Sequence, residues 1–246
     1  MKRLNWQILL GLYLIALSAL FYFIHYQIFK DAHHIFIYML GDIAFVPIEV
    51  LMVTLIIHRL LNEREKRSML KKLNMVIGAF FSEVGTQLLR SFYDFDTHAN
   101  IIREDLVVSK DWNDKKFAHV LKHLKNYDYR IDSKNGNLED LQGFLIGKRN
   151  FLLGLLENPN LLEHESFTEL LWAVFHLTDE FAHRKNLKQL PDTDYAHLSG
   201  DMKRAYVLLI FEWLAYIKHL KIDYPYLFSL AIRTNPFDPN ASPEVT

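Results

Sequence analysis

Residues 4–29, LNWQILLGLYLIALSALFYFIHYQIF, contain no Asp, Glu, Lys or Arg and decide the fold class of the N-terminal part of the chain. A helix of about 20 apolar residues is long enough to cross the hydrocarbon core of a bilayer. A cleaved signal peptide has an apolar core of only roughly 7–15 residues, whereas this run continues into aromatic residues. We therefore predict a transmembrane helix that stays in the mature protein.

A second apolar run, IFIYMLGDIAFVPIEVLMVTLII at residues 35–57, is interrupted only by Asp42 and Glu49. Each carboxylate costs roughly 2.5–3.5 kcal/mol at mid-membrane on insertion scales, which the surrounding apolar residues can offset. The link KDAHH at residues 30–34 is too short for anything except an antiparallel connection. The sequence therefore predicts a transmembrane hairpin over residues 1–58, with spans at about 4–29 and 35–57.

Cations close to the ends of the spans predict the orientation of this hairpin. The link carries only Lys30, whereas the other side carries Lys2, Arg3, Arg59 and the five cations of residues 64–72. We therefore expect a plasma-membrane protein with both termini in the cytoplasm. The five cations could also contact anionic lipid headgroups, although an ordinary cationic flank explains them more simply; they are Arg64, Lys66, Arg67, Lys71 and Lys72.

Asp42 and Glu49 are seven residues apart and fall on nearly the same face of the second predicted span. Pairing the two spans about their link brings His25 near Asp42 and Ser18 near Glu49. These acids could be hydrogen-bonded groups that hold the hairpin or an oligomer together, which is the interpretation we prefer. They could instead carry ions or protons, but two spans cannot line a pore, so conduction would require an oligomer.

Composition and motif searches exclude several classes of function. The chain has 28 Lys and Arg against 29 Asp and Glu, a balance that argues against general nucleic-acid binding. It has no Cys, which excludes disulfides, thiolate metal sites and a Cys nucleophile. No phosphate-binding loop, dinucleotide fingerprint, nucleophile elbow or EF-hand loop occurs in the sequence. We therefore predict no cofactor, and nothing in the sequence indicates an enzyme.

Residues 59–234 have helical periodicity and no alternating strand pattern, so we predict a cytoplasmic all-α bundle followed by a disordered tail at 235–246. Asn137 is expected to cap one helix, and Ser166 with Glu169 is expected to form a capping box at the start of another. A long helix is predicted over residues 195–220. One continuous helix is predicted from the second span to about Phe92.

The sharpest chemical pattern in this bundle is His176, Glu180 and His183, whose spacing places all three on one face of a helix. Two imidazoles and a carboxylate form a common divalent-metal set. Asp194, His197 and Asp201 repeat a similar spacing on the next helix. Both sets lie opposite the apolar stripes of their helices, so we expect solvated faces and keep a metal-binding bundle as the weaker alternative.

Three stretches resemble a family of uncharacterised two-span membrane proteins of anaerobic bacteria and archaea: HYQIFKDAHHIFIYMLGDIAFVPIEVLMVTLIIHRLLNEREKR, KLNMVIGAFFSEVGTQLL and YPYLFSLAIRTNPF. The resemblance implies a hairpin anchor with a cytoplasmic helical domain, and it implies no activity, cofactor or catalytic residue. We predict a membrane-anchored helical interaction or regulatory protein. Its expected partners are the lipid bilayer and either a protein partner or a second copy of the chain.

Overall fold

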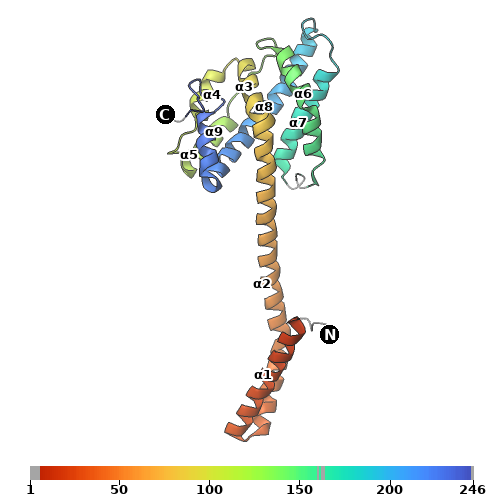
Figure 1. Cartoon of the computed structure of the whole chain (residues 1–246), viewed down its shortest axis with the longest axis vertical. Coiled ribbons are helices and arrows are strands. Elements are labelled where there is room, and N and C mark those ends of the chain that lie inside the picture. Colours follow the sequence, from red (N-terminus) through yellow and green to blue (C-terminus); the bar gives the residue numbers. More distant parts are fainter. Residues whose placement is uncertain (1–5, 160, 162–163, 245–246) are drawn as a thin grey trace. The chain divides into compact units, whose positions relative to one another are not determined.

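The computed structural model describes residues 6–159, 161 and 164–244, which are helical apart from their connecting segments (Figure 1). The chain divides into two units, Met1–Lys66 and Arg67–Thr246. The predicted all-α fold class is confirmed for the described residues, whose one β-type pairing is an isolated bridge between Asp96 and Ile131. The predicted domain boundary at 58–59 lies N-terminal to this division.

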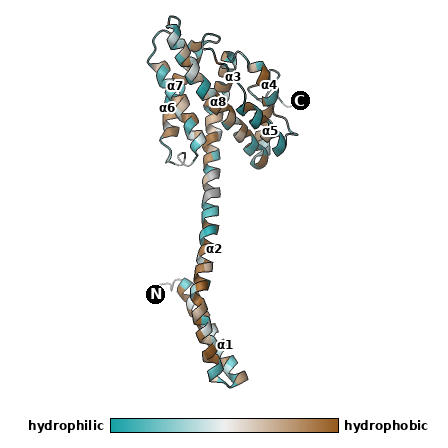
Figure 2. Cartoon of the chain, turned by 180° about the vertical axis from the view of Figure 1, so that it is seen from behind, coloured by the Kyte–Doolittle hydropathy of each residue, from teal (hydrophilic) through white to brown (hydrophobic). Residues whose placement is uncertain are grey.

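The first unit contains α1 (Trp6–Phe29) and the beginning of α2 (Ala32–Phe80), which fold back as a hairpin (Figure 1). Lys30 adopts a left-handed φ of 50° and ends α1, and the His34 amide donates a hydrogen bond of 3.2 Å to Asp31 Oδ1 at the start of α2. None of the described α1 residues is buried. Figure 2 shows apolar residues along both helices of the hairpin. Both helices are long and apolar enough to cross a membrane.

The second unit contains the end of α2 and seven further α-helices, with one π-helical turn, η1 (Phe81–Gly85), directly after α2. The α-helices are α3 (Thr86–Phe95), α4 (Ala99–Leu106), α5 (Asp114–Lys125), α6 (Leu138–Leu156), α7 (Glu165–Ala182), α8 (Asp192–Asp223) and α9 (Pro225–Arg233). The helical path from the second apolar run to Phe92 is therefore confirmed, with a π turn inside it. Helix α8 is central and packs against α3, α5, α7 and α9, while α6 packs against α7.

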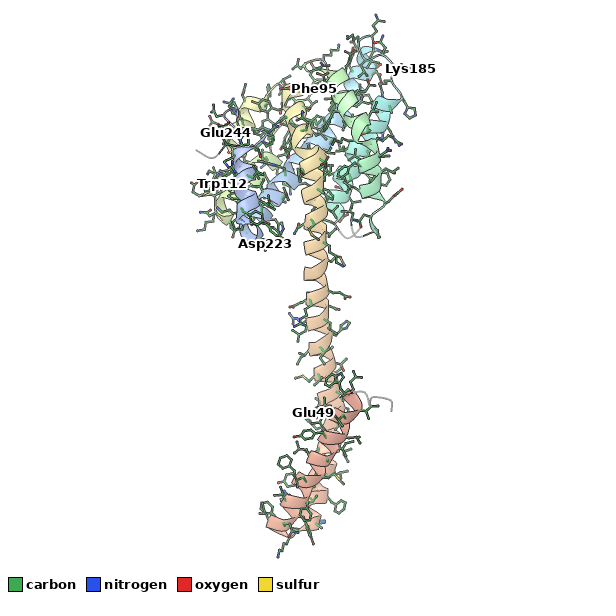
Figure 3. The ribbon with its side chains drawn as sticks, viewed as in Figure 1. Glu49, Phe95, Trp112, Lys185, Asp223 and Glu244 are labelled. Atoms are coloured by element: carbon green, nitrogen blue, oxygen red, sulfur yellow. The ribbon has the colours of Figure 1, made fainter. Side chains whose placement is uncertain are left out.

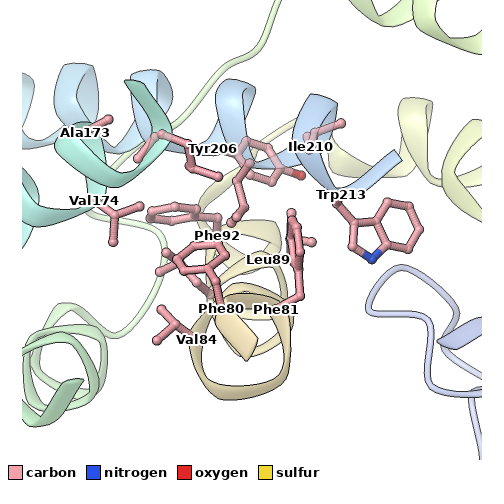
Figure 4. Packing of buried hydrophobic residues seen from close by; sticks show 14 of the residues in the cluster. Phe80, Phe81, Val84, Leu89, Phe92, Ala173, Val174, Tyr206, Ile210 and Trp213 are labelled. Carbon is pink, nitrogen blue, oxygen red and sulfur yellow. The ribbon is translucent and has the colours of Figure 1, made fainter. Parts of the chain in front are cut away.

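Aromatic side chains fill the core between η1 and α8 (Figure 4). The Phe81 ring stacks on Tyr216 with centroids 5.1 Å apart, and Phe80 packs edge-on against Phe167 at 5.3 Å. Within the π turn the Phe81 carbonyl accepts the backbone amide of Thr86, five residues further on, and a second hydrogen bond of 2.8 Å from the Thr86 hydroxyl.

Of the two helix caps predicted from the sequence, one is confirmed and the other is wrong. The side chain of Asn137 accepts hydrogen bonds from the amides of residues 139 and 140, so its predicted role as the cap of α6 is confirmed. The predicted Ser166 box is wrong, because α7 begins earlier and His164 caps it by accepting from the Phe167 amide. An imidazole nitrogen is an acceptor in this position, which the usual cap preferences overlook.

The prediction of a disordered tail at 235–246 is wrong for its first residues. Phe237 is 2% exposed, and its ring lies 5.3 Å from that of Trp213. Asn235 is also buried and donates a hydrogen bond of 2.8 Å to the Leu106 carbonyl. A single Phe between two prolines carries enough apolar surface to hold this segment against α8, and helical periodicity does not reveal it.

Candidate metal centre between helices α7 and α8

Polar side chains from α7 and α8 meet along one edge of the contact between these helices. His176 and Glu180 come from α7, and His197 and Asp201 come from α8. The prediction that the two sets face solvent, away from the packed surface, is wrong for Asp201, which is 5% exposed. Helical periodicity gives the angle of a residue around its own helix but not the lateral position of the neighbouring helix, and here α8 lies over the polar edge of α7.

The four side chains approach one another closely. Asp201 Oδ2 lies 3.4 Å from His176 Nε2 and 3.3 Å from His197 Nε2. Glu180 lies across from Asp201, with Oε1 3.8 Å from His176 Nε2 and Oε2 3.6 Å from His197 Nε2. Ligand atoms of His176, Glu180 and Asp201 all lie within 4.8 Å of one another. We call His176, Glu180, His197 and Asp201 the α7–α8 cluster.

Asp201 has one buried oxygen without a hydrogen bond. Its Oδ2 atom has no donor in hydrogen-bond geometry, although the two imidazole nitrogens are close. A buried carboxylate oxygen without a donor is costly, because it has lost its water without replacement. The α7–α8 cluster is therefore an incompletely satisfied polar site within the described residues.

Two arginines hold the carboxylates from outside the cluster. Arg184 Nη1 lies 2.5 Å from Glu180 Oε2, and the same guanidinium forms two hydrogen bonds with Asp194, of 2.6 and 2.8 Å. The Arg184 hydrogen bond lowers the pKa of Glu180, and it lowers the pKa of Asp194 in the same way. Arg204 Nη1 lies 3.5 Å from Asp201 Oδ1, which leaves Oδ2 facing the imidazoles.

His183, the third residue of the predicted set, does not join the cluster. Its Nδ1 atom lies 2.7 Å from the Asp179 carbonyl, at the C-terminal end of α7. Sequence reasoning therefore found His176 and Glu180 but grouped them with the wrong partner. The spacing of His197 and Asp201 was visible in the sequence, but nothing there indicated that these residues face α7.

A groove with a volume of about 810 Å³ runs beside the cluster and shares His176 with it. Its wall is apolar around Trp172, a residue that is 57% exposed. Two cations, Lys203 and Arg204, lie at the same groove. The lining residues are Glu169, Trp172, Ala173, His176, Gly200, Lys203, Arg204, Val207 and Leu208. Such a groove can accept a ligand with an apolar face and acidic groups.

The predicted polar residues of the hairpin are only partly brought together. Ser18 and His25 line one shallow groove on α1. His25 stacks on His34, with ring centroids 5.8 Å apart. Asp42 and Glu49 are exposed, and among the described residues neither forms a hydrogen bond or ion pair. Figure 3 shows the Glu49 side chain at the surface of the hairpin.

The predicted headgroup-binding cations lie in α2. Arg64 and Lys72 are exposed. The side chains of Lys66, Arg67 and Lys71 lie outside the described residues. Exposure leaves Arg64 and Lys72 available to anionic groups, and headgroup binding stays a prediction.

Family comparisons agree with the division into two helical parts. Residues 69–233 match the family described as "Uncharacterized protein MJ1433, C-terminal helical domain", and residues 2–61 match "MJ1433, N-terminal helical domain". The chain belongs to the MJ1433 family. It is 49% identical over 238 residues to "Uncharacterized protein MJ1433" of Methanocaldococcus jannaschii, covering 97% of this chain and 96% of that relative. No solved structure shows a significant match.

Membership of the MJ1433 family confirms the coarser part of the resemblance, namely an uncharacterised family with helical N-terminal and C-terminal domains. The two-span membrane character is a finer statement that these descriptions do not contain. It rests on the length and apolar composition of α1 and of the first part of α2.

Proposed function

We propose that this protein is a membrane-anchored helical binding protein, in which the hairpin inserts into the cytoplasmic membrane and the second unit binds a protein partner in the cytoplasm. The observation that carries the proposal is the groove beside α7 and α8. Exposed Trp172 gives it an apolar wall, and Lys203 and Arg204 give it positive charge. This combination favours an acidic amphipathic helix of the partner protein, lying with its apolar face in the groove.

The anchoring part of the proposal is supported by the hairpin helices. None of the described α1 residues is buried and most of them are exposed, and the apolar run in each of α1 and α2 is long enough to cross a membrane. Apolar surface of this extent is costly in water and favourable in hydrocarbon. The excess of cations beyond the open ends of the hairpin favours a cytoplasmic location for both termini.

Cysteine labelling tests the anchoring and its orientation. Because the chain has no Cys, single substitutions Asp31→Cys and Asn240→Cys introduce unique thiols. With a membrane-impermeant reagent on intact cells, we expect labelling at position 31 and none at 240 until the cells are permeabilised. Labelling at 240 but not at 31 would show the opposite topology. Extraction of the protein by alkaline carbonate would refute membrane insertion.

Site-specific photocrosslinking tests the groove. A photoreactive amino acid at Trp172 is expected to trap one discrete protein adduct in cells, whereas the same group at Ile101, which is 58% exposed on α4, traps none. Lys203→Glu should reduce the Trp172 adduct at least about tenfold if partner acids contact this cation. Lys185→Glu is the charge-matched control, because this exposed residue does not line the groove. Equal adducts at both crosslinking positions, or an adduct unaffected by Lys203→Glu, would contradict the proposal.

A second candidate function is an ion- or proton-conducting oligomer. The observation favouring it is that Asp42 and Glu49 are exposed on the hairpin, where within lipid each would need a neighbouring protein or water. Reconstituted protein should then show ion flux that disappears in the Asp42→Asn, Glu49→Gln double variant. Absence of flux, with normal insertion of the protein, would leave these acids as contacts between protein chains.

A further inference from the structure

We propose that the α7–α8 cluster is a site for one divalent transition-metal ion, with Zn²⁺ as the best match to its ligand types. His176, Glu180 and Asp201 form the mutually close set, and His197 approaches both carboxylates. This inference goes beyond the binding function proposed above. It does not depend on whether the groove holds a partner.

Two of the distances between ligand atoms fit tetrahedral coordination. Four ligand atoms about 2.0–2.1 Å from Zn²⁺ at the corners of a tetrahedron lie roughly 3.3–3.4 Å from one another. The two imidazole Nε2 atoms lie 3.3 and 3.4 Å from Asp201 Oδ2, which agrees with this spacing. Glu180 approaches His176 through Oε1, at 3.8 Å, and approaches His197 through Oε2, at 3.6 Å, so its carboxylate would have to rotate for one oxygen to serve both sides of the site.

The buried oxygen of Asp201 is an independent observation that points to a cation. A carboxylate that serves only as an ion-pair partner normally accepts hydrogen bonds, whereas Asp201 Oδ2 has no donor and faces both imidazoles. A metal ion between these three atoms would supply the positive charge that the buried oxygen lacks. The imidazole nitrogens would then act as neutral ligands rather than as hydrogen-bond donors.

The surrounding residues fit the second shell of a metal site. Arg184 binds Glu180 Oε2 and Arg204 lies beside Asp201 Oδ1, so Glu180 Oε1 and Asp201 Oδ2 are the oxygens without an arginine partner. Outer groups of this kind orient ligands before the metal arrives. With two nitrogen ligands and two carboxylates, the set favours Zn²⁺ over Mg²⁺ or Ca²⁺, which prefer six or more oxygen ligands.

Titration with Co²⁺ tests the site, because tetrahedral Co²⁺ has intense visible absorption that octahedral Co²⁺ lacks. Purified full-length protein in nanodiscs, stripped of metal, is expected to bind one Co²⁺ per chain with the tetrahedral spectrum and to lose the spectrum when Zn²⁺ is added. Asp201→Asn keeps the shape of the side chain and should weaken Co²⁺ binding at least about tenfold. His183→Ala should leave binding unchanged, since this residue is directed to the Asp179 carbonyl.

Two further variants keep the test decisive. His176→Ala removes a ligand whose side chain is 47% exposed, so it should weaken Co²⁺ binding without unfolding the bundle, even if Asp201→Asn lowers stability. His34→Ala measures background binding by the hairpin histidines and should have no effect on the tetrahedral spectrum. Absence of Co²⁺ binding, an octahedral spectrum, or binding unaffected by His176→Ala and Asp201→Asn would overturn the metal site.

Discussion

Gly85→Ala should destabilise the second unit, although the same substitution normally stabilises a helix. Gly85 is the last residue of the π turn η1 and is buried. An added Cβ would lie 2.5 Å from Phe81 Cδ1 and 2.9 Å from Phe80 Cε1. Both rings are within the core, with Phe80 0% and Phe81 2% exposed, so neither has room to move away.

The expected change in the free energy of unfolding is the difference between two opposing contributions. Replacing Gly by Ala inside a helix gains about 1 kcal/mol of intrinsic propensity. Overpacking of a core costs about 1–3 kcal/mol, and more where a contact is well below van der Waals distance. At a contact of 2.5 Å the overpacking cost lies in the upper part of this range, about 2–3 kcal/mol, so we expect a net loss of about 1–2 kcal/mol, which lowers Tm by roughly 2–8 °C for a unit of this size.

Gly147→Ala is the matched control, because Gly147 is exposed in α6 and an added Cβ there meets nothing within 4 Å. This variant should gain up to about 1 kcal/mol. Both variants are compared with the parent by thermal unfolding of full-length protein in nanodiscs, monitored by near-ultraviolet circular dichroism. If Gly85→Ala were as stable as Gly147→Ala, the close packing of the π turn against the two phenylalanines would be refuted.

Three other substitutions probe the second unit. Burial raises the pKa of Asp96, so between the ordinary pKa of 3.8 and the raised value the folded chain keeps a proton that the unfolded chain has lost. The free energy of unfolding should therefore fall as the pH rises through this interval. Asp96→Asn should flatten this pH dependence in denaturant titrations. Gln142→Met removes the hydrogen bonds of 2.8 and 2.9 Å from its amide to the Phe181 and Arg184 carbonyls, and should cost about 1–3 kcal/mol in urea unfolding, whereas an unchanged midpoint would show that these bonds contribute nothing. Phe237→Ala should cost about 3–5 kcal/mol and expose the tail to limited proteolysis, and a protease-resistant variant would contradict the packing described for this segment.

Much of the helical architecture could be predicted because its causes are local. The two apolar runs exceed the length of a membrane span, and the short link permits only a hairpin. The core stripe of α7 and the cap at Asn137 follow from helical periodicity and from the need to satisfy free amides at a helix start. Such features depend on residues close in sequence.

The α7–α8 cluster could not be predicted because it depends on two helices meeting at a particular angle. Periodicity placed His176 and Glu180 correctly on one face of α7, but it favoured His183 as their partner over Asp201. The buried position of Phe237 has the same origin, since it depends on packing across the core. The sequence by itself determined which segments are helical and which of their faces are apolar, because backbone hydrogen bonding and periodicity are local. Only the tertiary structure decided which polar groups share a site, because that depends on the lateral packing of helices distant in sequence.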